Sequence, residues 1–431
     1  MINTGNVLGL NARNRLFLSS NKKEGRKIAD SKLQTKRFLR RAGLPTPRIL
    51  ATFSNSAKIN DFAWETLPDN FVLKPSKGFG GQGILIVKKK AKWAGEWYLM
   101  DGSLIRTQDL RFHALEILAG RFSLHNTPDV AFIEERIKIQ KIFAKYVWHG
   151  TPDIRIIVFN KVPVAAMLRL PTKESQGKSN LHQGAIGVGV GLATGITTNG
   201  VLNGRFIRFI PRMKRKINGL KIPQWDKILT LAVRSQEAVP FLGYFGVDIV
   251  LDKERGPMIL ELNARPGLEI QNANLSPLKK RLERVEGLEI KDVEHGVRIA
   301  KALFTERFAD RVMAEEGIKT IKVWEKVKIV ASDKQKVEVE AKIDTGAWKT
   351  SIDKDLAEHL GILKSSNVLW TKIYKSSLGG EKRQVINLTF YLAGRKIETI
   401  ANIASRKNLR TPLIIGRRDL EGFLIKTERN Y

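Results

Sequence analysis

The sequence contains no cysteine among its 431 residues. This absence excludes disulfides, zinc fingers, cysteine-ligated iron–sulfur clusters and thiol nucleophiles. Acidic side chains are also scarce, because 43 of them stand against 75 lysines and arginines, which gives a formal net charge of +32. This imbalance excludes an ordinary near-neutral metabolic enzyme without electrostatic bias. It fits several polyanionic partners: nucleic acid, anionic lipid, polyglutamate or the phosphates of a nucleotide.

Long apolar runs are missing as well. No segment approaches the roughly eighteen apolar residues that a membrane-spanning helix needs. The first fifteen residues, MINTGNVLGLNARNR, do not resemble a signal peptide. We therefore expect a chain without a membrane span and a cytoplasmic location. Hydrophobic residues still make up 42% of the chain, enough for packed cores, and the length predicts two or three domains.

The pattern of the chain changes near residue 318. Before this point helical and strand patterns alternate, and after it short β-like runs with turns continue to the end. The sequence therefore predicts an α+β domain at residues 1–318 and a small all-β domain at residues 319–431. In the first domain we expect helices at 30–41, 224–240 and 292–318, and strands within 71–87, 131–137, 154–168, 244–251 and 258–262. The run 154–168 is expected to form a hairpin that turns at Asn160 and Lys161, and DKERGP is the expected turn between the last two strands.

A glycine-rich loop lies between two apolar strands in the segment FVLKPSKGFGGQGILIV. Glycines let backbone N–H groups approach a polyphosphate, and a concave nest of N–H groups favours anions. Lys74, at the end of the first strand, can add a point charge on a phosphate. The alternative is a glycine-rich hairpin without a ligand. The spacing matches neither the Walker pattern nor the dinucleotide fingerprint.

Carboxylate and amide groups gather on two later strands. Glu261 and Asn263, in ILELNARPG, are two residues apart and share one face of a strand. Asp248, in GVDIVL, can join them if the two strands form a hairpin. Such oxygen ligands suit Mg²⁺, which prefers carboxylates together with substrate phosphates. A polar outer face of the hairpin is the alternative interpretation.

Two intervening segments support a binding site between these motifs. AFIEERI (131–137) can act as a hinge strand that offers backbone groups to a flat base. PDIRIIVF (152–159) places Asp153 and Arg155 on one strand face, with Arg155 as a candidate phosphate clamp. Arg169 and SNLHQGA (179–185) are candidates for binding the substrate or a developing charge. Surface salt bridges on an exposed sheet are the alternative for each segment.

In this order the motifs resemble those of the ATP-grasp superfamily, and most of all its alpha-L-glutamate ligase-like (RimK-related) branch. The resemblance covers roughly residues 5–310 and includes the helix segment DSKLQTKRFLRRAGLPTP and RPGLEIQNAN. It implies an ATP-grasp fold that holds a nucleotide between two β-rich subdomains. It also implies an ATP- and Mg²⁺-dependent ligase, with Mn²⁺ as a possible substitute, that forms an amide through an acylphosphate.

The resemblance assigns roles to individual residues. Lys32, Lys74 and the loop glycines Gly78, Gly80, Gly81 and Gly83 would contact ATP, and Glu134, Glu135 and Ile137 would lie at the adenine hinge. Asp248, Glu261 and Asn263 would bind the metal. Arg155, Arg169, Asn180 and Arg265 would serve the phosphate or the acyl intermediate. The substrate would be an amino acid or an acidic peptide or protein.

A basic run, RFIRFIPRMKRK (205–216), fits an acidic acceptor such as a polyglutamate tail, with a solvated charged surface as the alternative. Residues 321–431 hold 22 basic and 13 acidic side chains, so the excess charge is spread over both predicted domains.

The second domain carries one Asp-Thr-Gly turn after an apolar strand, in AKIDTGAWKTSI, followed by TPLIIGRRDLEGFLI. This is the layout of an aspartic protease half-site, whose chemistry needs two close carboxylates that share a proton. One Asp344 per chain therefore requires a homodimer through this domain. Gly379 and Gly380 could form the tip of a flap. A chance DTG turn is the alternative.

Residues 324–431 resemble retropepsin-like proteases, nearest to a bacterial group labelled ATP-dependent zinc proteases. This resemblance implies that the second domain is a small all-β barrel. The sequence gives the zinc label no support, because it has no cysteine, no HExxH motif and no ligand spacing among its six histidines. The domain could bind peptide without cutting it. Two further functions remain open: a ribosome- or nucleic-acid-binding protein with a regulatory ATP site, and an aspartic peptidase regulated by nucleotide.

Overall fold

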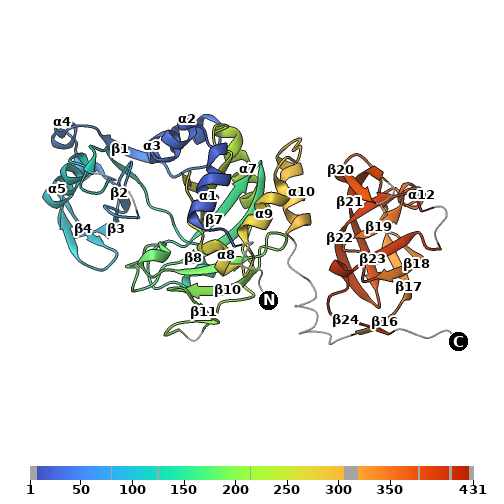
Figure 1. Ribbon diagram of the computed structural model, residues 1–431. Helices are drawn as coiled ribbons and strands as arrows, with labels where there is room; N and C mark the ends of the chain where they lie inside the picture. The colour runs from blue at the N-terminus through green and yellow to red at the C-terminus, as the bar shows by residue number, and fades with distance from the viewer. Residues whose placement is uncertain are drawn as a thin grey trace. The chain divides into compact units, whose positions relative to one another are not determined.

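The computed structural model describes residues 7–78, 80–123, 126–213, 215–304, 319–376, 379–406 and 410–426, without the side chains of 374–381. The chain forms two compact units, residues 1–287 and 288–431 (Figure 1). The helix predicted at 292–318 is present as α10 (Val293–Leu303), which belongs to the second unit. The predicted boundary at 318 falls at the edge of residues 305–318, which lie outside the described part.

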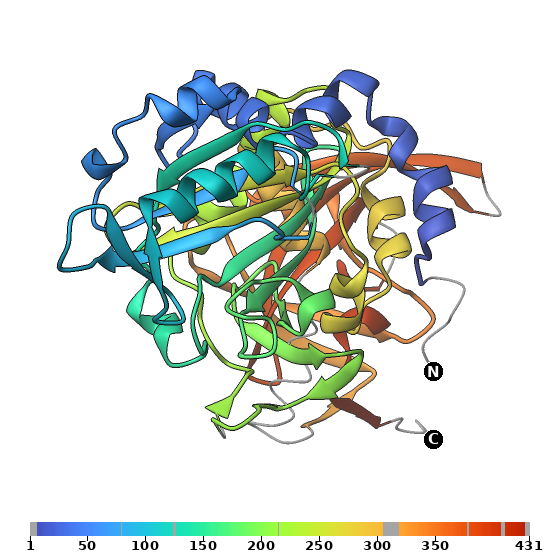
Figure 2. The ribbon, with the colours of Figure 1, turned by 90° about the vertical axis from the view of Figure 1, so that its left-hand side faces the viewer.

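The first sheet of unit 1 has six antiparallel strands in the order β1-β6-β2-β3-β4-β5. Its core includes Trp64, Phe71 and Trp97. Helix α5 (Thr107–Leu118) packs against β2, β5 and β6, and Figure 2 looks onto this helix. The strands are β1 (Ile49–Phe53), β2 (Phe71–Pro75), β3 (Leu85–Lys90), β4 (Glu96–Leu99), β5 (Leu104–Arg106) and β6 (Ala131–Glu135).

The second sheet of unit 1 has seven antiparallel strands in the order β11-β10-β9-β8-β7-β14-β15. Helix α7 (Trp225–Ala238) packs on β7, β8, β14 and β15. Helix α8 (Glu269–Ala273) packs on β8, β9 and β10, and α9 (Leu278–Val285) packs on β8. The strands are β7 (Asp153–Phe159), β8 (Val162–Leu170), β9 (Ile186–Val190), β10 (Thr197–Leu202), β11 (Arg205–Ile207), β14 (Tyr244–Asp252) and β15 (Gly256–Asn263).

Both hairpins that the sequence predicted in this sheet are present. The β7–β8 hairpin turns at Asn160 and Lys161, whose φ angles of 50° and 58° are those of a two-residue primed turn. The β14–β15 hairpin pairs Asp248 with Glu261, and β7 places Arg155 opposite Asp248 on the other side. The sheet register therefore aligns three predicted site residues across three neighbouring strands.

Short helices precede and link the two sheets. Helix α3 (Lys32–Arg41) begins two residues later than predicted, because Ser31 caps it: its side chain accepts a hydrogen bond from the backbone N–H of Gln34. The helix contacts α2, α7 and β15. The remaining elements of unit 1 are α1 (Leu10–Leu16), η2 (Leu18–Ser20), α2 (Lys23–Ala29), α4 (Ser56–Asn60), η3 (Trp64–Thr66), α6 (Lys141–Ala144), η5 (Leu181–Gln183), β12 (Phe209–Ile210) and β13 (Arg215–Lys216).

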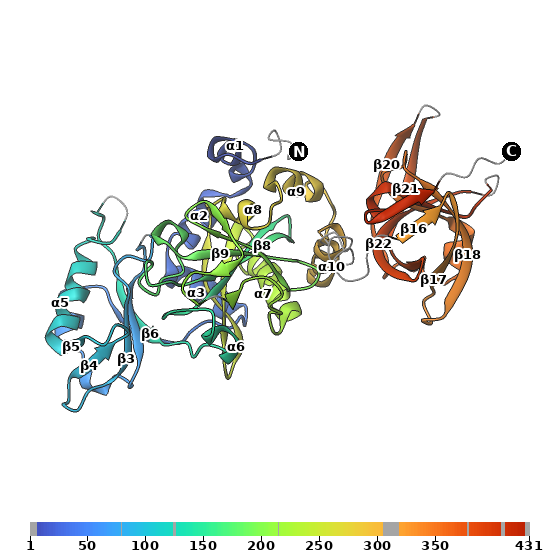
Figure 3. The same ribbon diagram turned by 90° about the horizontal axis from the view of Figure 1, so that it is seen from below.

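The second unit contains a closed six-stranded barrel with the order β17-β18-β23-β19-β22-β21, because β21 also pairs with β17. Strand β20 pairs with β21 outside the ring, and β16 pairs with β24 in a separate two-stranded sheet. Figure 3 shows the barrel strands from a second direction. The strands are β16 (Lys319–Lys322), β17 (Trp324–Val330), β18 (Lys336–Asp344), β19 (Thr350–Asp353), β20 (Val368–Ser376), β21 (Gly379–Leu392), β22 (Arg395–Ala404), β23 (Leu413–Gly416) and β24 (Phe423–Lys426).

The expected small barrel is present, and the expectation of an all-β domain needs one correction. Residues 319–431 also contain the short helix α12 (Lys354–His359) and the 3-10 helix η6 (Arg417–Asp419). Asp353 explains α12, because its carboxylate caps the helix by accepting hydrogen bonds from the N–H groups of Asp355 and Leu356. Among the described helices of the chain, none is long and apolar enough to cross a membrane.

Candidate functional site

The glycine-rich loop between β2 and β3 has a backbone that needs glycine. Gly80, Gly81 and Gly83 have φ angles of 63°, 77° and 69°, in the left-handed region that favours glycine. A Cβ atom on Gly78 would lie 2.2 Å from Cγ of Pro75, which is too close for any side chain. The four predicted loop glycines therefore allow a path that an ordinary sequence could not follow.

The predicted segment 179–185 supports this loop. The side chain of Asn180 donates a hydrogen bond of 2.9 Å to the carbonyl oxygen of Gly80, and Gln183 donates one of 3.0 Å to the same atom. Asn180 also caps η5 through its bond to the N–H of His182. The structure therefore places Asn180 at the glycine-rich loop.

Lys32, the first residue of α3, lies between the loop and the predicted metal residues. Its Nζ donates to the carbonyl oxygen of Gly78 at 2.9 Å and lies 3.7 Å from Oε2 of Glu261. The start of α3 is itself fixed to the end of β2, because the N–H of Lys32 donates to the carbonyl oxygen of Ser76 at 2.9 Å. One side chain thus connects two motifs that are more than 180 residues apart in the sequence.

Behind the loop, two lysines pair with one carboxylate. Nζ of Lys36 lies 2.9 Å from Oε2 of Glu134, and Nζ of Lys74 pairs with Oε1 of the same residue. All three side chains are buried. Burial by itself would raise the pKa of Glu134, but the ammonium groups of Lys36 and Lys74 outweigh it and hold that pKa below its ordinary value. Burial lowers the pKa of Lys36, although Glu134 opposes this.

Asp248 is the centre of a second buried network. Arg155 donates to both of its carboxylate oxygens, from Nε at 2.7 Å and from Nη2 at 2.6 Å. Arg169 donates to Oδ2 of Asp248 at 2.6 Å and holds Asp153 through two further bonds of 2.5 and 2.7 Å. The two predicted arginines therefore fix Asp248, which is 1% exposed, rather than pointing freely toward a phosphate.

The two aspartates of this network titrate differently. Burial raises the pKa of Asp153 to about 6, helped by Asp248 and opposed by Arg169. Burial also acts to raise the pKa of Asp248, but Arg155 and Arg169 together lower it well below its ordinary value. Arg169, between two carboxylates, is held charged, because they outweigh burial and raise its pKa. At neutral pH the network thus keeps Asp248 ionised.

Glu261 and Asn263 complete the predicted metal set. The amide of Asn263 donates to Oδ2 of Asp248 at 3.3 Å and to Oε1 of Glu261 at 3.4 Å, so the three side chains meet. Glu261 and Asn263 are half-buried and reach solvent, whereas Asp248 is enclosed. One carboxylate and one amide oxygen beside a cationic loop fit Mg²⁺, which completes its shell with water and substrate phosphates. In the part of the chain that the structure describes, no three His, Asp or Glu residues form a metal-holding group.

The remaining predicted residues of unit 1 lie farther from this centre. Glu135 pairs with Arg255 and accepts from the N–H of Arg48 at 2.7 Å. Ile137 is buried just past the end of β6. Arg265 is half-exposed and lies 3.3 Å from Asp30. The backbone of Glu134 pairs within the sheet on both sides, so a hinge role through its backbone stays a prediction.

The basic run at 205–216 is largely exposed. It forms β11, β12 and β13, with Phe206 60% and Phe209 49% exposed. Arg212 lies 3.8 Å from Glu174, and Arg215 lies over the ring of Tyr146. A role for this run toward an acidic acceptor stays a prediction.

In the second unit, Asp344 ends β18 and begins the predicted turn. Its Oδ1 accepts hydrogen bonds from the N–H groups of Gly346 at 2.9 Å and Ala347 at 3.1 Å. The following strand is held to η6, because the hydroxyl of Thr350 bonds to the carboxylate of Asp419. Gly379 and Gly380, where the tip of a flap was predicted, begin β21 and pair with Ser376 and Lys375 of β20. Residues 377–378, between the two strands, lie outside the described part, and a role as a flap stays a prediction.

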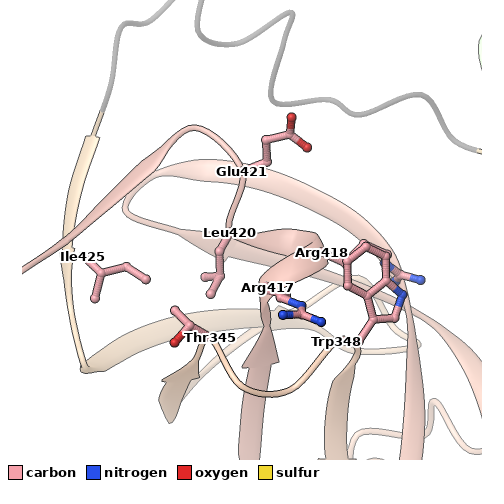
Figure 4. Close-up of a pocket in the computed structure, with 7 residues that line it drawn as sticks. All are labelled: Thr345, Trp348, Arg417, Arg418, Leu420, Glu421 and Ile425. Carbon is pink, nitrogen blue, oxygen red and sulfur yellow. The ribbon is translucent and has the colours of Figure 1, made fainter. Parts of the chain in front are cut away.

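A cavity of about 340 Å³ lies beside this turn (Figure 4). The guanidinium of Arg417 lies over the ring of Trp348, 5.3 Å from its centroid, and Trp348 is 42% exposed. Leu420 and Ile425 give the cavity an apolar part. The other lining residues are Thr345, Arg418 and Glu421.

Sequence reasoning missed two members of the site. Lys36 was read as part of a basic helix, although its spacing of four residues from Lys32 places both on one helix face. Gln183 lay within a motif that was singled out, but its bond to Gly80 depends on the fold of a distant loop.

Comparison with known families agrees with the fold. The family model described as sugar-transfer associated ATP-grasp matches residues 11–287. Because this match spans more than half of the chain, the protein belongs to that ATP-grasp family. The predicted superfamily is thereby confirmed, and the matching model is not that of the glutamate ligase-like branch.

Solved structures show only distant likeness. The chain is 16% identical to the ATP-grasp ligase PsnB, complexed with its minimal precursor, over 62% of each chain, with a TM-score of 0.33. It is 16% identical to D-alanine–D-alanine ligase from Bacillus anthracis over 65% of this chain and 71% of that one, with a TM-score of 0.34. Simian foamy virus protease is 20% identical over 22% of this chain and 90% of its own, with a TM-score of 0.18. No curated protein matches the sequence.

Proposed function

We propose that unit 1 is an ATP- and Mg²⁺-dependent ligase that joins a carboxylate to an amine. The observation that carries this proposal is the position of Lys32, whose ammonium lies 2.9 Å from the glycine-rich loop and 3.7 Å from Glu261. The glycine-rich loop, whose backbone N–H groups we propose as the phosphate-binding groups, and an oxygen ligand for a cation are thus within reach of one side chain. Membership of the ATP-grasp family supports the same site.

The residues divide the work of two steps. In the first step a substrate carboxylate oxygen attacks the γ-phosphorus of ATP, the bond to the β-phosphate oxygen breaks, and ADP leaves. In the second step the amine nitrogen attacks the acyl carbon, phosphate leaves, and the amine proton passes to solvent. Lys32, Lys74 and the loop N–H groups position the phosphates and balance their charge. No nucleophile of the protein is needed.

Glu261 and Asn263 would hold Mg²⁺ or Mn²⁺ in this site. When bound, the metal supplies positive charge on the phosphate oxygens. Arg155 and Arg169 keep Asp248 ionised and in place, and the amide of Asn263 is oriented by Asp248. We propose that the main role of Asp248 is to position Asn263, and with it the metal-binding strand β15.

The substrate is the finer part of the proposal. The positive charge of the chain favours an acidic amino acid, peptide or protein as substrate, as in a glutamate ligase-like enzyme. The family description adds an association with sugar transfer. A screen should therefore include amino sugars beside acidic amino acids and acidic peptides as amines.

The test is ADP release with each substrate pair, using wild type and Glu261→Gln. We expect a substrate-dependent signal that falls at least about a hundredfold in Glu261→Gln, because a metal ligand is lost. Glu269→Gln is a matched control, since this half-buried glutamate begins α8 and, among the described residues, makes no hydrogen bond or ion pair with the glycine-rich loop. Background ADP release with all substrates, unaffected by Glu261→Gln, would reject the ligase.

For the second unit we propose a retropepsin-like domain that binds peptide as a homodimer. Support comes from Asp344 in a tight turn at the end of a barrel strand and from the cavity beside it. Two copies of Asp344 across a two-fold axis would form the required carboxylate pair. A peptidase acting in this way would work at acidic pH, where one carboxyl of the pair is protonated.

This second proposal is tested by peptide cleavage and by sedimentation. We expect a dimer at micromolar concentration and a loss of cleavage in Asp344→Asn, with Asp355→Asn as the control on the nearby helix α12. If wild type does not cleave peptide, and Asp344→Asn still binds it, the second unit is a peptide-binding domain without peptidase activity. If the protein is a monomer and its cleavage of peptide does not depend on Asp344, the proposed pair of Asp344 carboxylates is wrong.

A further inference from the structure

The cluster of Lys36, Lys74 and Glu134 contains one more cation than its carboxylate needs. Glu134 is buried, with 4% of its side chain exposed, and each of its two oxygens pairs with one ammonium group. Lys74 stands at the end of β2, two residues before the loop begins, and retains 8% exposure. Lys36 is fully enclosed on α3. The inner lysine is therefore fixed, and the outer one is next to the site.

We propose that Lys36 is a positioning residue that keeps Glu134 neutralised, so that Lys74 is available to the phosphates of the nucleotide. This inference rests on the proposed nucleotide site of unit 1. When Lys74 turns to a phosphate, Glu134 retains the ammonium of Lys36 as its partner. Without Lys36, the same movement would leave a buried carboxylate unpaired, which is strongly unfavourable.

The position of α3 explains how one helix can serve this role. Lys32 and Lys36 are four residues apart and so lie on the same helix face. Lys32 reaches the loop at Gly78, whereas Lys36 reaches the sheet at Glu134. Ser31 fixes the helix start, because its hydroxyl lies 3.0 Å from that of Ser76. The helix therefore supplies one cation to the ligand side and one to the carboxylate behind it.

The inference predicts a coupling between two substitutions. In Lys36→Met, Lys74 becomes the partner that Glu134 needs, and we expect the Kd for nucleotide to rise roughly tenfold. In Lys36→Met/Glu134→Gln, Lys74 is released again, and we expect the Kd to return to within about threefold of wild type. A lysine with a merely structural role would not show this recovery. Arg37→Met, at an exposed position of the same helix, is the matched control.

The experiment uses the full chain and a fluorescent, non-hydrolysable ATP analogue with Mg²⁺, with binding followed by anisotropy. Thermal unfolding of each variant checks that it is folded. An equal Kd in Lys36→Met and Arg37→Met would overturn the inference, as would a double variant that binds no better than Lys36→Met. If neither wild type nor Lys74→Met binds the analogue, the proposed nucleotide site itself is rejected, and the inference is rejected with it.

Discussion

Arg169 shows how much a single buried side chain can hold together. It pairs with Asp153 and Asp248 and is 8% exposed. In Arg169→Met, two buried carboxylates would share Arg155 as their cation, and removing one member of a buried ionic network costs about 3–5 kcal/mol. We expect the free energy of unfolding of unit 1 to fall by this amount in urea titrations.

The control for this substitution is an arginine on the surface. Arg212→Met breaks a pair with Glu174 in which the arginine side chain is 74% exposed. Such pairs are worth less than about 1 kcal/mol. Equal losses in the two variants would contradict a structural role for the network around Arg169.

Asp153 predicts a pH dependence of stability. Its pKa in the folded protein is raised to about 6, from an ordinary value of 3.8, so the folded state binds its proton more tightly than the unfolded state. This contribution to stability is complete below about pH 4 and is lost as the pH rises through 6. A pKa difference of one unit corresponds to about 1.4 kcal/mol, so the contribution of Asp153 to the free energy of unfolding is at most about 3 kcal/mol.

The variant Asp153→Asn removes this titration. We expect the unfolding free energy of wild type to have a falling component between pH 4.5 and 6.5 that is absent in Asp153→Asn, measured by urea unfolding at several pH values. Asp101→Asn, at an exposed turn, should keep the falling component between pH 4.5 and 6.5, because hydrogen bonds from Ser103 hold the pKa of Asp101 below its ordinary value and any effect of this group falls at lower pH. A profile of Asp153→Asn that runs parallel to that of wild type would show that the group does not titrate in this range.

The sequence predicted side chains that local motifs define and missed those that packing defines. The glycines of the loop, Glu261 and Asn263 were found because their spacing has a direct chemical reason. The pairing of Lys36 with Glu134 was not, since helix spacing does not tell which strand lies against the helix. The arginine partners of Asp248 depend on the order of strands β7, β14 and β15, which only the folded sheet sets.

Turns and caps were among the features best predicted from sequence. The β7–β8 turn was placed correctly because an Asn-led pair lies between two apolar runs, and the start of α3 was predicted to within two residues. The barrel was expected only through the resemblance to a known fold, because the pairing that closes it, β17 with β21 at Lys328 and Tyr391, leaves no local signal in the sequence. Helix α12 was overlooked because six residues carry little periodic signal.

The β7–β8 turn itself allows a stabilising substitution. Lys161 has a φ of 58°, which costs an L-residue roughly 1 kcal/mol that glycine does not lose. We expect Lys161→Gly to raise the free energy of unfolding by about 0.5–1 kcal/mol, measured by urea denaturation. Lys227→Gly, inside helix α7, should instead lower it by about 1 kcal/mol. A loss in Lys161→Gly like that in Lys227→Gly would contradict the assigned turn.

The division into two compact units predicts two unfolding transitions. Residues 1–287 and 288–431 have separate cores, so calorimetry of the full chain should resolve two events. A nucleotide at 100 times its Kd should stabilise the first unit by about 2.7 kcal/mol, which raises the unfolding temperature of that unit and leaves that of the second unit unchanged. Lys74→Met should abolish this rise in the unfolding temperature of the first unit. A single transition that moves as a whole with nucleotide would contradict independent units.

The closed barrel leaves one strand, β20, outside its ring, and such a strand offers backbone groups to any other chain in β-conformation. Helix α10 occupies part of this edge, because Nε2 of His295 contacts the carbonyl oxygen of Leu369 at 2.5 Å, while its Nδ1 accepts from the N–H of Lys291. We expect this contact, together with the charge of Lys372 in the same strand, to protect the unit against edge-to-edge pairing with other chains. Deleting this contact would therefore first be noticed as slow aggregation of a protein that is still folded.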